Sequence, residues 1–83
     1  MNYTLAFDKQ PLDFVENLPK EIGTRILNKL ADTKPNPYHF FRRLTGRTDY
    51  RLRVGDYRII ADIDDGSRVI HVTMAAHRKN VYE

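Results

Sequence analysis

The sequence contains no cysteine, which excludes disulfide bonds and zinc–thiolate sites. It also lacks an apolar run long enough to cross a membrane, and its N-terminus has no basic stretch followed by an apolar one. Small secreted domains usually depend on disulfide bonds. We therefore expect a cytoplasmic protein without a membrane partner.

The chain has 83 residues, of which 41% are hydrophobic and 30% charged. This length and composition predict one globular domain over residues 1–83, with a modest core and little excess stability. A partner that binds the folded state would stabilise it further. We therefore expect such a partner.

Positive charge is concentrated in the second half of the chain. Residues 1–41 contain five basic and five acidic side chains, whereas residues 42–82 contain nine basic and five acidic ones. Such asymmetry suggests a polyanionic partner, although an inert basic surface is the commoner explanation of a mild excess alone.

The pattern of apolar residues predicts an α+β domain. Residues 3–7 alternate as in a strand, and two helices follow, with Asp8 as the cap of the first and Pro19 between them. Residues 38–46 suggest a covering loop. Three strands over residues 49–54, 57–64 and 67–74 form an antiparallel meander, with the helical hairpin packed on one face of the sheet.

Two turns set the expected register of the meander. Gly55-Asp56 suits a type II′ turn and Asp65-Gly66 a type I′ turn. The first turn places Arg53 directly opposite Arg58, and the second places Arg58 opposite Thr73. Alternation then predicts one core face and one open face. The core face comprises Tyr50, Leu52, Val54, Tyr57, Ile59, Ala61, Ile63, Ile70, Val72 and Met74.

Three arginines share the open face, namely Arg51, Arg53 and Arg58. Like charges directly opposite one another destabilise a sheet, and a bound anion would relieve that repulsion. Arginine's planar fork also matches phosphate oxygens. A phosphate-binding surface for RNA is our interpretation, and a solvated face with splayed arginines is the alternative.

The C-terminal segment adds His77, Arg78, Lys79 and Tyr82. It can fold back beside the arginines, where a histidine could transfer protons and a tyrosine could stack on a base. Taken singly, each of these residues is more often structural.

The runs LTG at 44–46, YRLRVGDYRII at 50–60 and HRKNVY at 77–82 together resemble the RelE family of the RelE/ParE toxin–antitoxin superfamily. The expected order of elements matches along nearly the whole chain. The resemblance implies a ribosome-dependent endoribonuclease that cleaves mRNA in the A site without a metal or other cofactor. It also implies a cognate antitoxin, which often binds operator DNA in complex with the toxin.

The resemblance also implies site residues. The predicted catalytic residues are Arg53, Arg58, His77, Arg78 and Tyr82, and the predicted RNA-binding residues are Arg43, Arg47, Arg51 and Lys79. Many family members have a basic residue where this chain has Ala75-Ala76, and many have a further C-terminal helix.

The expected reaction is attack of a 2′-hydroxyl on the adjacent phosphate. Arg53, Arg58 and Arg78 would stabilise the charged transition state, and Arg51 would position the backbone. His77 is the candidate for proton transfer, because arginine stays protonated. No metal site is expected, since Asp62, Asp64 and Asp65 suggest turn and surface positions.

Three alternatives remain open at this point. The first is a ParE-like toxin that inhibits DNA gyrase without hydrolysis. The second is an RNA-binding relative with weakened catalysis, and the third is a structural dimerisation domain, for which the sequence shows no dedicated surface.

Overall fold

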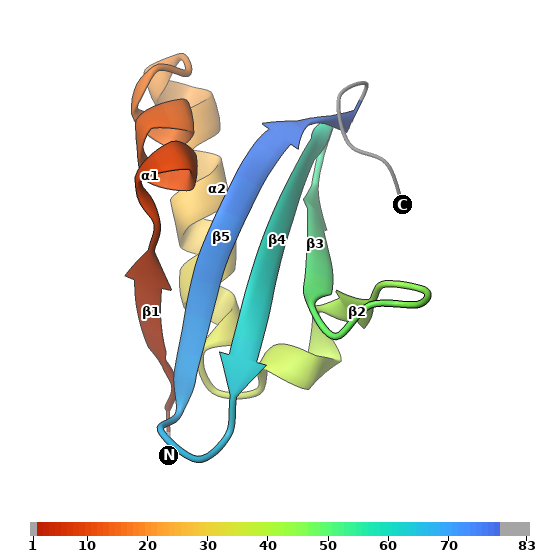
Figure 1. Ribbon diagram of the computed structural model, residues 1–83. Helices are drawn as coiled ribbons and strands as arrows, with labels where there is room; N and C mark the ends of the chain where they lie inside the picture. The colour runs from red at the N-terminus through yellow and green to blue at the C-terminus, as the bar shows by residue number, and fades with distance from the viewer. Residues whose placement is uncertain (1, 79–83) are drawn as a thin grey trace.

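The computed structural model describes residues 2–78. Two helices pack on one face of a five-stranded mixed sheet (Figure 1). The elements are β1 (Thr4–Phe7), α1 (Lys9–Glu16), α2 (Lys20–Thr33), the short 3-10 helix η1 (Pro37–His39), β2 (Arg42–Arg43), β3 (Tyr50–Val54), β4 (Tyr57–Asp64) and β5 (Val69–His77). The predicted α+β class is confirmed. Within residues 2–78 no helix is long and apolar enough to cross a membrane.

The sheet has the order β1-β5-β4-β3-β2. β1 is parallel to β5, and the other neighbouring strands are antiparallel. Residues 38–46 were expected to form a covering loop with a partial turn; η1 agrees with the turn, but the loop is wrong in part because it also contains β2. β2 pairs with only the first two residues of β3, namely Tyr50 and Arg51.

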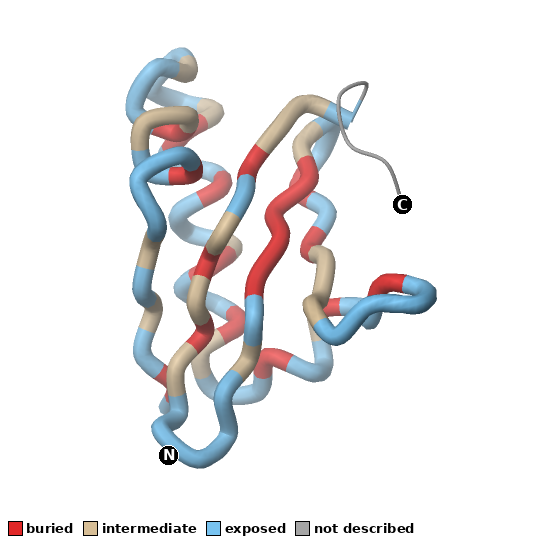
Figure 2. Tube along the Cα trace, viewed as in Figure 1, coloured by how far each residue is buried: buried red, intermediate tan, exposed pale blue. Residues whose placement is uncertain are grey.

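The core lies between the helices and the sheet. Ile26 and Leu30 of α2 are fully buried against Leu52, Ile59 and other strand residues. Figure 2 shows a continuous buried run in β4, the central strand, which covers residues 58–61. The expected helical hairpin is present, but Asp8 does not cap α1 with its side chain. Its carboxylate instead lies 2.6 Å from Nε2 of His71.

The turn between β3 and β4 agrees with the sequence. Gly55 has a positive φ of 57° and Asp56 does not, which is the pattern of a type II′ turn. The predicted pair Arg53–Arg58 is confirmed, and Arg51 pairs with Ile60.

The turn between β4 and β5 differs from the prediction. Asp64 pairs with Val69, so the loop has four residues, and Arg68 rather than Gly66 has the positive φ. The Asp64 carboxylate accepts hydrogen bonds from the backbone N–H groups of Gly66 and Ser67, at 2.9 and 3.2 Å. This side-chain turn competes with the two-residue type I′ turn and replaces it.

A β-bulge then changes the phase of β5. Ala61 pairs with Val72 but Ile60 pairs with Met74, so Thr73 is an extra residue. Beyond the bulge, Ala75 is fully buried while Met74 is 36% exposed. The predicted core position of Met74 is therefore wrong, as is the predicted pairing of Arg58 with Thr73. Arg58 lies opposite Ala76.

Candidate nucleic-acid interface

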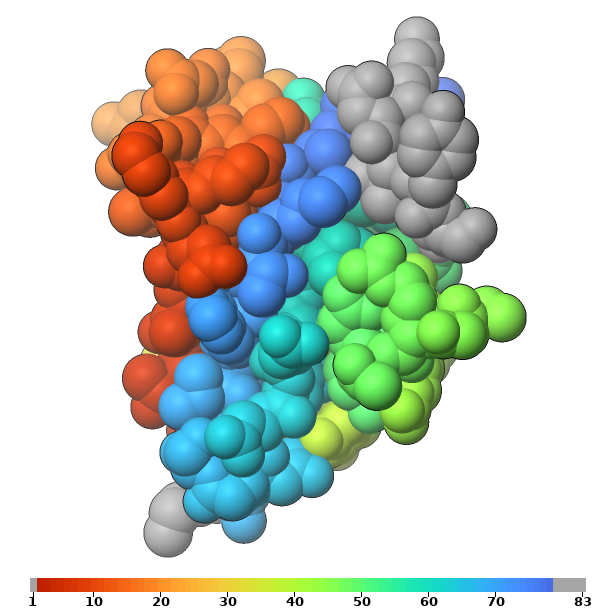
Figure 3. Space-filling model, viewed as in Figure 1, coloured from red at the N-terminus to blue at the C-terminus, as the bar shows by residue number. Residues whose placement is uncertain are grey.

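The face of the sheet that points away from the helices carries a cluster of arginines, which we call the arginine face. Arg53 and Arg58 are direct partners in the β3–β4 ladder, and Arg51 lies two residues from Arg53 on the same face. Arg42 of β2 pairs with Arg51. Antiparallel partners share a face, so four arginines from three adjacent strands lie together. Figure 3 views the molecule from this side, with β4 and β5 between the N-terminal elements and the segment around β2.

Arg58 is at the centre of the cluster and is only 8% exposed. Burial lowers the pKa of its guanidinium, and the positive charges of Arg53, Arg51 and Arg78 lower it further, while Asp56 acts in the opposite direction. Arginine nevertheless remains protonated at neutral pH. The cluster therefore concentrates positive charge that a bound anion would stabilise.

Arg78 joins the cluster from the end of β5. Its backbone N–H donates to the carbonyl oxygen of Asp56 at 2.7 Å, which fixes the segment against the β3–β4 turn. Its Nε atom lies 3.8 Å from Oδ1 of Asp56. Arg78 is close enough to Arg58 to lower the pKa of that side chain. The expected approach of Arg78 to the arginines is thus observed.

His77 occupies a different place from the expected one. It pairs with Tyr57 in the β4–β5 ladder, and its ring meets the Tyr57 ring edge-on at a centroid distance of 5.5 Å. Tyr57 in turn packs edge-on against Phe14 of α1. His77 therefore lies on the side of the sheet that the helices cover, because the bulge at Thr73 reverses the alternation. Its role in proton transfer stays a prediction, and its position argues against that role.

The predicted RNA-binding residues Arg43 and Arg47 are both outside the arginine face. Arg43 pairs with Tyr50, and its guanidinium lies 5.8 Å from the centre of that ring. Nη2 of Arg47 forms an ion pair with Oδ2 of Asp49 at 2.6 Å. The structure thus does not bring these two arginines to Arg58. Lys79 and Tyr82 lie outside the described residues.

Arg42 was not predicted from the sequence to lie near Arg58, and the structure places it on the arginine face. It reaches the arginine face only because residues 42–43 form a strand, and alternation then separates Arg42 from Arg43. The signal was the pair Arg42-Arg43 itself, since two consecutive arginines in any strand must point to opposite faces. Residues 38–46 show no strand pattern, so the sequence did not indicate that these two arginines would lie on opposite faces of the sheet.

Comparison with known proteins identifies the class. The chain belongs to the family described as the ParE toxin of type II toxin–antitoxin systems, parDE, which matches residues 5–82. It is thus a type II toxin of the RelE/ParE superfamily, as the motifs indicated. No curated protein sequence matches the chain.

Several solved structures share the fold of this chain. An archaeal RelE–RelB complex from Pyrococcus horikoshii OT3 contains a chain 27% identical, with a TM-score of 0.82, over 98% of this chain and 100% of that one. The toxin–antitoxin complex RelBE2 of Mycobacterium tuberculosis gives 22% identity and a TM-score of 0.82, over 94% and 100%. The intact Escherichia coli RelBE complex gives 22% and 0.76, over 90% and 95%.

Proposed function

We propose that this toxin is a ribosome-dependent mRNA endoribonuclease of the RelE type. The observation that carries the proposal is the buried Arg58 surrounded by Arg51, Arg53 and Arg78. Like charges placed around a buried guanidinium lower the stability of the fold, and a bound polyanion would relieve this repulsion. RNA phosphates are such a polyanion, and arginine binds them through two parallel hydrogen bonds.

The proposed reaction is attack of a 2′-hydroxyl on the adjacent phosphorus, with loss of the 5′-oxygen of the next nucleotide. Negative charge grows on the phosphate oxygens, and Arg53, Arg58 and Arg78 would stabilise it without rearrangement. β3 and β4 already hold the first two, and the backbone hydrogen bond to Asp56 holds Arg78. Arg51 would position the RNA backbone, and Tyr82 would stack on a base. His77 lies on the other side of the sheet, so it could transfer a proton only if the RNA passed around the end of β5.

We further propose a cognate antitoxin as the partner of this chain. The toxins of Pyrococcus horikoshii, Mycobacterium tuberculosis and Escherichia coli were solved in complex with their antitoxins. An antitoxin that covers the arginine face would exclude RNA from it. In this proposal mRNA and the ribosome are the cytoplasmic targets, and operator DNA is bound only by the toxin–antitoxin complex.

Inhibition of DNA gyrase without hydrolysis is the second candidate, because the matching family is described as ParE toxins. A third is RNA binding with weakened catalysis, since Ala75-Ala76 provides no basic side chain and Ala76 lies directly opposite Arg58. Both alternatives share the fold, so the fold does not discriminate among them.

The test is primer extension on a defined mRNA translated in vitro. The wild-type chain, an Arg58→Ala variant and a Lys20→Ala control are compared, with and without ribosomes. Lys20 is an exposed residue at the start of α2, away from the arginine face. New 5′ ends that need ribosomes and Arg58 but not Lys20 are expected.

Intact message at full translation would overturn the nuclease proposal. A gyrase supercoiling assay on the same preparations would then test the second candidate. Cleavage that is equal in the wild-type and Arg58→Ala proteins would remove Arg58 from the mechanism.

A further inference from the structure

A second cationic site adjoins the arginine face where β2 ends beside β3. It is a cavity of about 410 Å³. Five of its seven lining residues have basic side chains and none has a carboxylate. The basic residues are Lys29, His39, Arg42, Arg51 and Arg53. α2, η1, β2 and β3 each contribute to the lining, so the cavity exists only in the folded chain.

Two of these arginines have no carboxylate partner within the described residues. Within residues 2–78, neither Arg42 nor Arg53 forms an ion pair with a carboxylate, and Arg42 lies directly opposite another arginine, Arg51. The Lys29 ammonium lies over the Phe40 ring, 5.1 Å from its centre. This contact holds the lysine beside the cavity without cancelling its charge. Stability therefore does not explain the arrangement, since like charges across a ladder are unfavourable.

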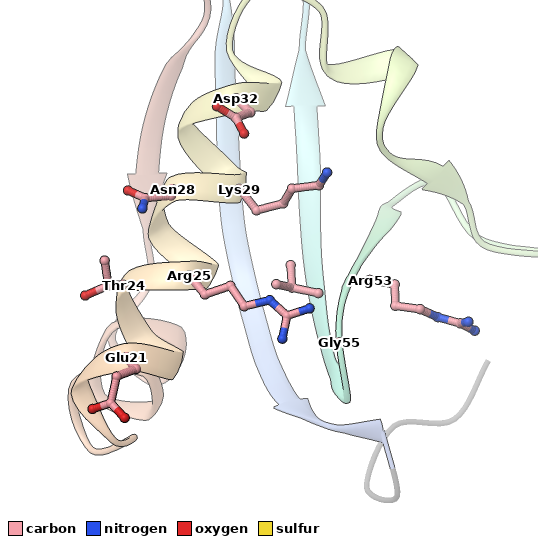
Figure 4. A pocket seen from close by; sticks show the side chains of 9 residues that line it. Glu21, Thr24, Arg25, Asn28, Lys29, Asp32, Arg53 and Gly55 are labelled. Atoms are coloured by element: carbon pink, nitrogen blue, oxygen red, sulfur yellow. The ribbon is translucent and has the colours of Figure 1, made fainter.

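A neighbouring cavity between α2 and β3 provides the contrast (Figure 4). It has a volume of about 550 Å³ and shares Lys29 and Arg53, but Glu21 and Asp32 also line it. In Figure 4 Arg53 points away from α2, whereas Arg25 and Lys29 extend from α2 toward β3. Of these two cavities, only the one at the β2 end of this edge has a lining without a carboxylate, and Arg53 lies between that end and Arg58.

We propose that the cavity beside β2 binds the phosphate adjacent to the one held at Arg58, on the same single-stranded RNA. This inference rests on the proposed function. Arg51 and Arg53 are two residues apart on one face, which separates their Cα atoms by about 7 Å. That distance is comparable to the spacing of successive phosphates in an extended strand. One phosphate meets Arg53 and Arg58, and the next meets Arg42 and Arg51, with Lys29 and His39 as further donors.

The experiment measures binding of a hexaribonucleotide with 2′-O-methyl groups, which cannot be cleaved, by fluorescence anisotropy. The proteins are the full-length wild type, Arg42→Ala, His39→Ala, Arg58→Ala and the control Lys20→Ala. Lys20→Ala removes the same charge as Arg42→Ala but lies outside the cavity. Circular dichroism establishes that each variant is folded, and His39→Ala provides a second test of the cavity from a different element.

We expect Arg42→Ala to weaken binding about tenfold and His39→Ala a few-fold, with Lys20→Ala unchanged. The slope of log affinity against log salt should fall by about 0.7 for Arg42→Ala, as for one lost phosphate contact on a single strand. A neutral methylphosphonate is then placed at each linkage in turn. At one linkage the methylphosphonate should make the affinities of wild type and Arg42→Ala equal. At the adjacent linkage it should make the affinities of wild type and Arg58→Ala equal.

Three results would overturn the second phosphate site. One is an equal loss for Arg42→Ala and Lys20→Ala, another is no loss for Arg42→Ala, and the third is a single linkage that couples to both arginines. If Arg58→Ala weakens binding and Arg42→Ala does not, the arginine face still binds RNA and only the second site is wrong. If neither variant weakens binding, the proposed RNA function itself fails.

Discussion

Arg58 of β4 lies directly opposite Ala76 of β5, while the neighbouring Ala75 is fully buried in the core. Two adjacent alanines thus have opposite surroundings, because the bulge at Thr73 fixes which of them faces the arginines. Ala76 therefore places no cation directly opposite Arg58.

This relationship predicts different outcomes for two similar substitutions. Ala76→Arg should fold and should raise RNA affinity several-fold, since it adds a cation beside Arg58. Ala75→Arg should unfold the domain, because it places an unpaired charge in the core. Thermal unfolding and RNA-binding assays on both variants check the prediction. A folded Ala75→Arg protein would contradict the bulged register.

Arg53→Ala should separate stability from function. Arg53 is exposed and faces Arg58, so its removal relieves repulsion and should leave stability unchanged or raise it by a few tenths of a kcal/mol. mRNA cleavage should fall by about 10²-fold through loss of one electrostatic contact to the transition state. Urea denaturation and primer extension measure the two effects. A marked loss of stability would show that Arg53 has a structural role.

His77→Ala should reduce cleavage far less than Arg58→Ala does. The His77 ring packs on Tyr57, on the helix-covered side of the sheet, so its removal should affect mainly local packing. We expect a decrease within about fivefold, against 10²-fold or more for Arg58→Ala. Single-turnover cleavage over pH 5–8 is the measurement. A large loss, together with disappearance of a pH-dependent limb, would restore His77 as the proton-transfer group.

Asp65 should make the stability of the fold depend on acid pH. The hydroxyls of Tyr3 and Tyr38 both donate to its Oδ1 atom at 2.7 Å, and these hydrogen bonds lower the pKa of Asp65 below the usual 3.8. A lowered pKa in the folded state stabilises the protein above about pH 4, and this contribution is lost as the pH falls through the lower folded value.

The variants Asp65→Asn and Tyr38→Phe test this contribution. Asp65→Asn should be less stable at pH 7 and should lose less stability than the wild type between pH 4 and pH 2. Tyr38→Phe removes one donor and should move the pKa of Asp65 back toward 3.8. Urea midpoints across this range and an NMR titration of the carboxyl carbon measure both effects. If the urea midpoints of wild type and Asp65→Asn fell equally between pH 4 and pH 2, Asp65 would not be the source of the acid dependence.

Gln10 should contribute to stability through the backbone of β5. Its side-chain amide donates to the carbonyl oxygen of Ala75 and accepts from the N–H of Ala75, both at 2.8 Å. Gln10 thereby continues the pairing of β5 beyond the end of β1, next to the bulge. Gln10→Ala should cost about 1–3 kcal/mol, since two backbone groups lose their partner. Lys9→Ala, which removes an exposed ion pair, should cost much less than Gln10→Ala.

Much of the fold followed from local sequence signals. Ile26 and Leu30 recur at helical spacing and are buried, and Pro19 separates the two helices as predicted. Gly55 identified the β3–β4 turn because few other residues adopt its positive φ. That turn sets the pairing of Arg53 with Arg58, so the centre of the candidate site was readable from residues 53–58.

Other features had no local signal. The two-residue strand β2 is too short to show alternation, and it forms because β3 offers an open edge. The bulge at Thr73 depends on how β5 fits both β4 and the helices, and it decides the positions of Met74, Ala75, Ala76 and His77.

The α+β class, the helices, the β3–β4 register and the superfamily could all be predicted from the sequence, because each depends on short-range spacing or on a motif. The three-dimensional fold was needed to show which other basic residues join Arg51, Arg53 and Arg58. Arg42 joins the arginine face while Arg43 does not, and His77 lies behind the sheet rather than beside Arg58. The physical reason is that a strand alternates its side chains, so one extra residue or one unexpected strand moves a side chain from one face to the other.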